Sequence, residues 1–176
     1  MAGNETFQII NSASQDTATI FELYRLATEY QRSHGYNEWK EFDPELIALE
    51  IKDKRHWKIV IDDSIACIFS VFYNDPLLWG EQDNDHSIYI HRIATNPAFK
   101  GKGMIKLIID WAKNHAKETG RKFIRMDTWA DNKILADYYL KCGFNVVGYR
   151  QFDKEAKGLP KHYSTLSLVL FEIEVQ

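Results

Sequence analysis

The sequence is poor in the features that mark metal-binding, exported or membrane-spanning proteins. It has two cysteines, Cys67 and Cys142, far apart and without the spacing of a zinc site. We therefore expect buried free thiols in a reducing compartment and no bound metal. There is no long apolar run and no signal-peptide pattern at the start, which predicts a cytoplasmic protein with no membrane partner.

An excess of positive charge is also missing. The chain has 22 basic and 25 acidic residues, for a net charge of −3. Nucleic-acid binding needs clustered Lys and Arg, so this balance argues against a nucleic-acid partner. At 176 residues, with no repeat, low-complexity tract or linker, the sequence predicts one domain over residues 1–176.

Apolar periodicity and cap residues predict alternating strands and helices. Strands are expected at 6–10, 57–61, 65–73, 88–95, 122–128, 144–152 and 164–175. Helices are expected from the caps at 11–14 to near Gly35, and at 43–54, 104–116 and 132–142. Residues 74–85 and 153–163 are predicted to be loops.

The stretch from 87 to 116 organises the chain. A strand ends at Asn96-Pro97, and a short basic loop with Gly101 and Gly103 leads directly into a helix. The apolar face of this helix is predicted to consist of Met104, Leu107, Ile108, Trp111 and Ala112. A glycine-bearing turn before a helix N-terminus suits an anion, because the first amides have no partner inside the helix.

Three lysines, Lys100, Lys102 and Lys106, add positive charge around this loop. A phosphate or pyrophosphate is the expected guest, although an ordinary strand–helix turn with solvated lysines would look the same. The dinucleotide fingerprint does not fit, because Lys106 stands where it needs a third glycine. The P-loop pattern is absent.

Two motifs resemble the GNAT family of N-acetyltransferases. Residues 100–105, KGKGMI, are similar to its Arg/Gln-x-x-Gly-x-Gly/Ala loop, with Lys100 in place of Arg or Gln and Ile105 in place of a small residue. Asn132, Tyr139 and Gly143-Phe144 follow with the spacing of the family's downstream signature. Tyr139 alone would read as a core aromatic, but the two motifs together favour a functional role.

The resemblance implies an α/β (α+β) fold with a mixed, mostly antiparallel seven-stranded sheet flanked by about four helices. It also implies acetyl-CoA as cosubstrate. By the same resemblance, pantetheine lies along the strand before the loop, and the loop amides hold the pyrophosphate. An asparagine and a tyrosine further along the chain also lie beside the cofactor. The matching residues here are Ile93, Ala94, Thr95, Lys100, Gly101, Lys102, Gly103, Met104, Ile105, Asn132 and Tyr139.

The chemistry implied is direct attack of a primary amine on the thioester, which needs a general acid for the leaving thiolate and a base for the amine. Tyr139 is the candidate acid. His91 is the candidate base, or else a histidine hydrogen-bonded within the sheet; the period of two predicts that it shares a face with Tyr89, Ile93 and Thr95. Arg92 is expected on the opposite face, beside a carboxylate such as Asp127.

The acceptor is predicted to be an amine of a small molecule or peptide, and nothing in the sequence selects one. Its site is expected to involve aromatic and histidine residues that could equally cap the core: Tyr30, Tyr36, Trp39, Trp79, His162 and Tyr163. Two alternatives stay open at this point, an acyl-CoA sensor without turnover, suggested by Ile105, and a nucleotide-binding protein of another fold. A homodimer through terminal strands is consistent with the resemblance.

Overall fold

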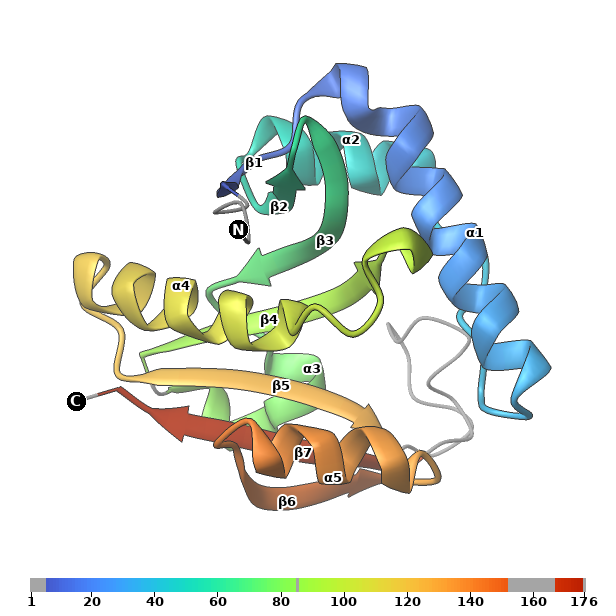
Figure 1. The fold of residues 1–176 in the computed structure, drawn as a ribbon. Coiled ribbons are helices and arrows are strands. Elements are labelled where there is room, and N and C mark those ends of the chain that lie inside the picture. Colours follow the sequence, from blue (N-terminus) through green and yellow to red (C-terminus); the bar gives the residue numbers. More distant parts are fainter. Residues whose placement is uncertain (1–5, 85, 152–166, 176) are drawn as a thin grey trace, which may run out of the picture.

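The computed structural model describes residues 6–84, 86–151 and 167–175, which form one sheet with helices on both faces (Figure 1). The strands are β1 (Phe7–Asn11), β2 (His56–Ile61), β3 (Ser64–Phe72), β4 (Ser87–Thr95), β5 (Phe123–Trp129), β6 (Asn145–Gln151) and β7 (Ser167–Glu174). The helices are α1 (Thr17–Ser33), α2 (Pro44–Lys52), α3 (Pro76–Trp79), α4 (Met104–Glu118) and α5 (Lys133–Lys141). Short 3-10 turns lie at η1 (Ser14–Asp16), η2 (Gly80–Asn84) and η3 (Pro97–Phe99).

The sheet has the strand order β1-β2-β3-β4-β5-β7-β6. Only the central pair, β4 with β5, is parallel, and every other neighbouring pair is antiparallel. The crossover between the two parallel strands is α4, which lies with α5 on the near face in Figure 1. The predicted mixed, mostly antiparallel seven-stranded sheet is therefore confirmed.

Local sequence signals set the boundaries of several elements. The side chains of Asp43 and Asn132 accept hydrogen bonds from backbone amides in the first turns of α2 and α5, which satisfies otherwise unpaired donors. Asp62 and Asp63 both have positive φ (46° and 63°) in the two-residue turn between β2 and β3. That conformation is the hairpin turn whose twist matches the flanking strands.

One predicted loop contains a helix. Asp75 caps a single turn that starts with Pro76, and the turn buries Leu78 and Trp79 against the sheet. The structure thus has five helices in its described residues, the four expected ones and α3. The sequence signal was present, since Asp-Pro is the same start that predicted α2. Among these helices, none combines the length and apolar character needed to span a membrane.

The core divides by sheet face. The largest cluster lies under α4 and α5 and includes Phe69, Ile108, Tyr139 and Phe171. On the other face, α1 and α2 pack Tyr24 and neighbouring apolar residues against Ile68 and Ala94, while α3 packs against Tyr89, Trp129, Leu168 and Leu170. In α4, Ile105 and Ile109 are buried, whereas the predicted Leu107 and Trp111 are only half-buried at the edge of the core.

A β-bulge interrupts β4. Ile68 pairs with Ala94 but Ser70 pairs with His91, so two steps along β3 match three along β4. Arg92 occupies the bulge with φ of +52°, a left-handed conformation that is costly for a residue with a Cβ. Its guanidinium contacts both carboxylate oxygens of Glu50, which is fully buried in α2.

The bulge overturns two expectations about β4. Ile93 packs against the α4/α5 cluster and Thr95 contacts Cys67 there, whereas Tyr89 lies in the α3 cluster. The four alternate residues therefore do not share a face, because one extra residue reverses the alternation. Arg92 also lies beside Glu50 rather than Asp127.

We expect Glu50→Gln to lower the free energy of unfolding by about 3 kcal/mol, because it leaves the Arg92 charge buried without a counter-ion. Urea unfolding of the purified chain measures this. Glu22→Gln, which breaks an exposed pair with Arg25, is the control and should change stability little. Equal stability of Glu50→Gln and wild type would show that the pair does not hold the bulge.

Candidate functional site

The glycine loop presents free backbone donors at the start of α4. Gly101 and Gly103 have φ of +83° and +73°, which glycine adopts without strain. The amides of Gly101, Gly103, Met104 and Ile105 donate no hydrogen bond within the described part of the chain. A Cβ added at either glycine would meet no atom within 4 Å, so the space around the loop is open. This arrangement suits an anionic group such as a pyrophosphate.

The loop is tied to its surroundings by side chains. Asn96 accepts a hydrogen bond from the Ala98 amide and donates one to the Ile65 carbonyl of the neighbouring strand. Lys100 lies over the ring of Tyr30 in α1, 4.7 Å from its centroid. These contacts hold the loop between the sheet and α1, so its amides are fixed before any ligand arrives.

Ile105 points away from this loop. Its side chain is 9% exposed and belongs to the core cluster under α4. A small residue is therefore not needed there to leave room for a ligand on the loop, and only the Ile105 amide faces the open helix end. The feature that suggested a sensor without turnover has a packing explanation.

The central strands β4 and β5 stop pairing before β4 reaches the glycine loop. β4 and β5 pair only from Ser87↔Phe123 to Tyr89↔Arg125, although β4 continues to Thr95 and β5 to Trp129. Beyond Tyr89, β4 pairs with β3 on one side, and among residues 6–84, 86–151 and 167–175 no strand pairs with its other side. Its other edge is a row of unpaired backbone groups to which an extended chain can add as a strand does.

The predicted cofactor residues Ile93, Ala94 and Thr95 all lie on this unpaired part of β4. The free edge ends at Thr95, and the glycine loop follows it after the short η3 turn. A molecule with an extended amide-bearing arm and a pyrophosphate, as coenzyme A has, fits both features in sequence. Contacts of Ile93, Ala94 and Thr95 with such a molecule stay a prediction.

Tyr139 lies on α5 and belongs to the core cluster under α4 and α5. The side chain is 6% exposed, its ring packs edge-on against Phe171, and Phe144 lies beside it. Burial raises the pKa of its hydroxyl well above the usual range, and the nearby charges of Asp127 on β5 and Cys142 raise it further. The phenol thus stays protonated at any physiological pH and can donate a hydrogen bond.

Asn132 has a structural role that sequence reasoning did not assign. Its Oδ1 accepts a hydrogen bond from the Leu135 amide at 3.1 Å and so starts the helix that carries Tyr139. A contact between Asn132 and the cofactor stays a prediction.

His91 lies on the opposite face of the opening, between two carboxylates. Its Nε2 is 3.0 Å from Asp75 Oδ2 and its Nδ1 is 3.5 Å from Asp127 Oδ1. Burial lowers the pKa of His91, but the contact with Asp75 and the charges of both carboxylates outweigh burial and raise the pKa above its ordinary value. Burial raises the pKa of Asp127 to about 6, with His91 opposing the shift.

Sequence reasoning missed the partners of His91. Asp75 falls in the segment 74–85 that was predicted to be a loop, and Asp127 was expected beside Arg92. The alternation of β5 places Arg125, Asp127 and Trp129 on one face, which could have put Asp127 beside His91. Within the described residues, no group of three His, Cys, Asp or Glu side chains has the arrangement of a metal site.

Tyr89 is not available for proton transfer. It is fully buried, its hydroxyl accepts a hydrogen bond from Arg125 at 3.1 Å, and burial raises its pKa to about 12. The indole of Trp79 stacks edge-on against Tyr89 and under the Arg125 guanidinium, and it is 2% exposed. Trp79 therefore belongs to the core rather than to an acceptor site.

The remaining predicted acceptor residues lie around α1. Tyr30, His34 and Tyr36 pack together at the end of α1, and Trp39 packs against Tyr24 and Phe42. His162 and Tyr163 lie outside the described residues.

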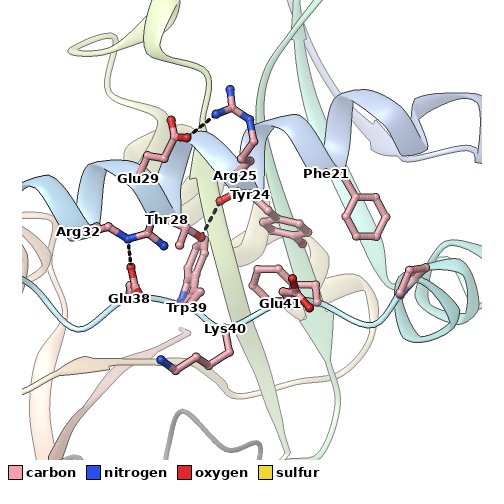
Figure 2. A pocket seen from close by; sticks show the side chains of 12 residues that line it. Phe21, Tyr24, Arg25, Thr28, Glu29, Arg32, Glu38, Trp39, Lys40 and Glu41 are labelled. Carbon is pink, nitrogen blue, oxygen red and sulfur yellow. Dashed lines mark hydrogen bonds and ion pairs between the residues drawn. The ribbon is translucent and has the colours of Figure 1, made fainter.

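A hollow of about 610 Å³ opens between α1 and the segment that follows it (Figure 2). Its lining includes Tyr24, Trp39 and Phe42 but no residue of the glycine loop, β4 or β5. The hollow is therefore distinct from the opening between the central strands. The free amides and the buried titratable groups indicate the candidate active site better than the hollow does.

Comparison with known proteins identifies a family for this chain and solved structures with the same fold. Residues 18–144 match the acetyltransferase (GNAT) family. The uncharacterized N-acetyltransferase YesJ of Bacillus subtilis is 27% identical over 169 residues, which cover 86% of this chain and 94% of YesJ.

Solved structures share the architecture at low sequence identity. A GNAT-family acetyltransferase from Listeria monocytogenes has a TM-score of 0.76 and 23% identity, covering 99% of this chain and 98% of its own. The acetyltransferase yncA from Salmonella typhimurium, solved with its cofactor acetyl-CoA, has a TM-score of 0.67 and 13% identity, covering 97% and 94%. These likenesses show the fold.

We expect Gly103→Ala to weaken coenzyme A binding at least about tenfold, because the Cβ disfavours the left-handed conformation that aims the loop amides. Isothermal titration with coenzyme A measures this. Gly120→Ala is a matched control, since Gly120 has φ of +67° and open space around it but follows the C-terminus of α4.

Both variants should lose about 1 kcal/mol of stability from backbone strain, and only Gly103→Ala should lose affinity. Equal affinities for the two variants would place the anion site elsewhere.

Proposed function

The chain belongs to the acetyltransferase (GNAT) family, and on that premise we propose that it moves an acetyl group from acetyl-CoA to a primary amine of a small molecule or peptide. Members of this family are acyltransferases that use acetyl-CoA as cosubstrate. The observation that carries the proposal is the continuity of two features, the unpaired edge of β4 beyond Tyr89 and the free amides at the start of α4.

When bound, acetyl-CoA supplies an activated acetyl thioester. The amides of Gly101, Gly103, Met104 and Ile105 would hold its pyrophosphate, and the edge of β4 at Ile93, Ala94 and Thr95 would hold its pantetheine arm. Fixing the arm along a strand edge orients the reacting group, which lowers the entropy lost on reaching the reactive geometry.

Tyr139 is proposed as the general acid that protonates the leaving sulfur. Its phenol is buried on the α5 side of the opening and remains protonated because burial raises its pKa. A desolvated O–H donor stabilises a developing thiolate more strongly than it would in water. The proton acceptor for the amine belongs on the other side of the opening, where His91 lies.

We expect Tyr139→Phe to lower kcat by about 10²-fold while leaving the Kd for acetyl-CoA within about threefold, because it removes only a proton donor. Tyr138→Phe is the control, since Tyr138 is the half-buried neighbour on the same helix. Thiol release with a panel of primary amines measures the rates. Full activity of Tyr139→Phe would assign the acid to another group.

The pH profile provides a second test. Because the folded pKa of Tyr139 is raised, loss of its proton should not limit the rate at pH 9 or below. An alkaline fall in kcat below pH 9 that disappears in Tyr139→Phe would contradict the protonated, buried phenol.

A further inference from the structure

The cluster of Asp75, His91 and Asp127 is built from three separate elements. Asp75 precedes α3, His91 lies on β4 just before the bulge, and Asp127 lies on β5 two residues beyond the last β4–β5 pair. Their side chains are 12%, 14% and 9% exposed. The ring of Phe72 meets the imidazole edge-on at 5.3 Å and closes one side of the cluster.

Each nitrogen of the imidazole lies near a carboxylate oxygen, at 3.0 Å and 3.5 Å, and two nearby anions favour the charged imidazolium form of the ring. The contact with Asp75 has ion-pair distance without hydrogen-bond alignment, which leaves Asp75 Oδ2 buried without a hydrogen-bond partner in the described chain. Arg92, the adjacent cation, is held by Glu50. The cluster of one cation and two anions therefore carries a net charge of about −1 in this protonation state.

Asp127 also affects the pKa of a residue on the other side of the sheet. Its charge raises the pKa of Tyr139, although the two side chains belong to opposite faces. An interaction across the sheet is consistent with the position of Asp127, because β4 and β5 no longer pair at that point. Asp127, two residues beyond the last β4–β5 pair, therefore lies close enough to Tyr139 for its charge to favour the protonated phenol.

We propose that Asp127, His91 and Asp75 form a proton-accepting array for an acceptor that arrives as an alkylammonium, with Asp127 taking the proton, His91 orienting Asp127, and Asp75 positioning His91. The inference rests on the proposed function. It makes Asp127, rather than His91, the group that takes the proton from the amine. An imidazolium has no free lone pair with which to accept a proton, whereas a carboxylate keeps lone pairs on both oxygens.

The proton balance is complete with these residues. An alkylammonium that becomes an amide gives up two protons as the C–N bond forms and the C–S bond breaks. Tyr139 gives one proton to the departing sulfur. Asp127 accepts the protons from nitrogen in turn, one is returned to the Tyr139 phenolate, and the other leaves to water. One proton is therefore released per turnover.

The charged groups that shift the pKa of His91 are Asp75, Asp127 and Arg92, and the charge of Asp127 also raises the pKa of Tyr139. Arg92 lowers the pKa of His91 and the two carboxylates raise it. Burial holds the pKa of Asp127 near 6, within the range suited to a base at neutral pH.

The first experiment reads the charge of His91 without any acceptor. Imidazole NMR on the histidine-labelled chain, assigned with His91→Gln, should show His91 as an imidazolium at pH 7. Asp127→Asn and Asp75→Asn should each lower its pKa by about one or more, because each removes a charge within about 4 Å. A neutral His91, or a pKa that neither variant moves, overturns the array.

The second experiment measures transfer to two amines of similar size, benzylamine and aniline. Asp127→Asn should lower kcat/KM about 10²-fold for benzylamine and about tenfold for aniline, since aniline arrives uncharged and gives up one proton rather than two. Asp75→Asn should instead move the pH midpoint of kcat/KM, as a positioning residue does. Asp110→Asn, an exposed change on α4, is the control.

The outcomes separate the two proposals. If the wild type acetylates alkylamines and Asp127→Asn matches it, the array is wrong and the transferase activity stands. If wild type acetylates no amine in a broad panel while binding acetyl-CoA, the proposed function fails and takes the array's role with it.

Discussion

The buried ion pair between Arg92 and Glu50 holds the feature on which the site depends, a bulge in the central strand. A left-handed backbone at a residue with a Cβ costs about 1–2 kcal/mol, and here the pair with a fully buried carboxylate offsets that cost. Because a bulge bends the strand that contains it, β4 turns away from β5 after Tyr89. We infer that the ion pair, by holding the bulge, helps to keep open a strand edge that a regular sheet would pair.

Two faces of the sheet contribute opposite chemistry at that opening. From the α5 side comes a buried phenol that stays protonated, and from the α3 side comes a histidine held between carboxylates. The same burial that raises the pKa of the Tyr139 hydroxyl also raises that of Asp127. In the mechanism that we propose, this burial prepares a proton donor on one side of the sheet and a proton acceptor on the other.

The sequence predicted what local chemistry determines and missed what distant contacts determine. The cap at Asp43 and the turn at Gly101 and Gly103 act within a few residues, so the start of α2 and the free loop amides were predictable. The bulge at Arg92 depends on Glu50, forty-two residues away, and it reversed the alternation used to assign faces. The partners of His91 come from two other elements, which periodicity alone could not bring together.

The proposed function requires a coenzyme on the free edge of β4 and on the amides at the start of α4. Amide NMR of the chain titrated with coenzyme A tests it most directly. The account predicts that the signals of Gly101, Gly103, Met104, Ile105 and the Ile93–Thr95 segment shift together with one Kd, while those of Gly35 and Gly120 do not. Saturable shifts confined to the hollow beside α1, with the loop signals unmoved, would contradict it.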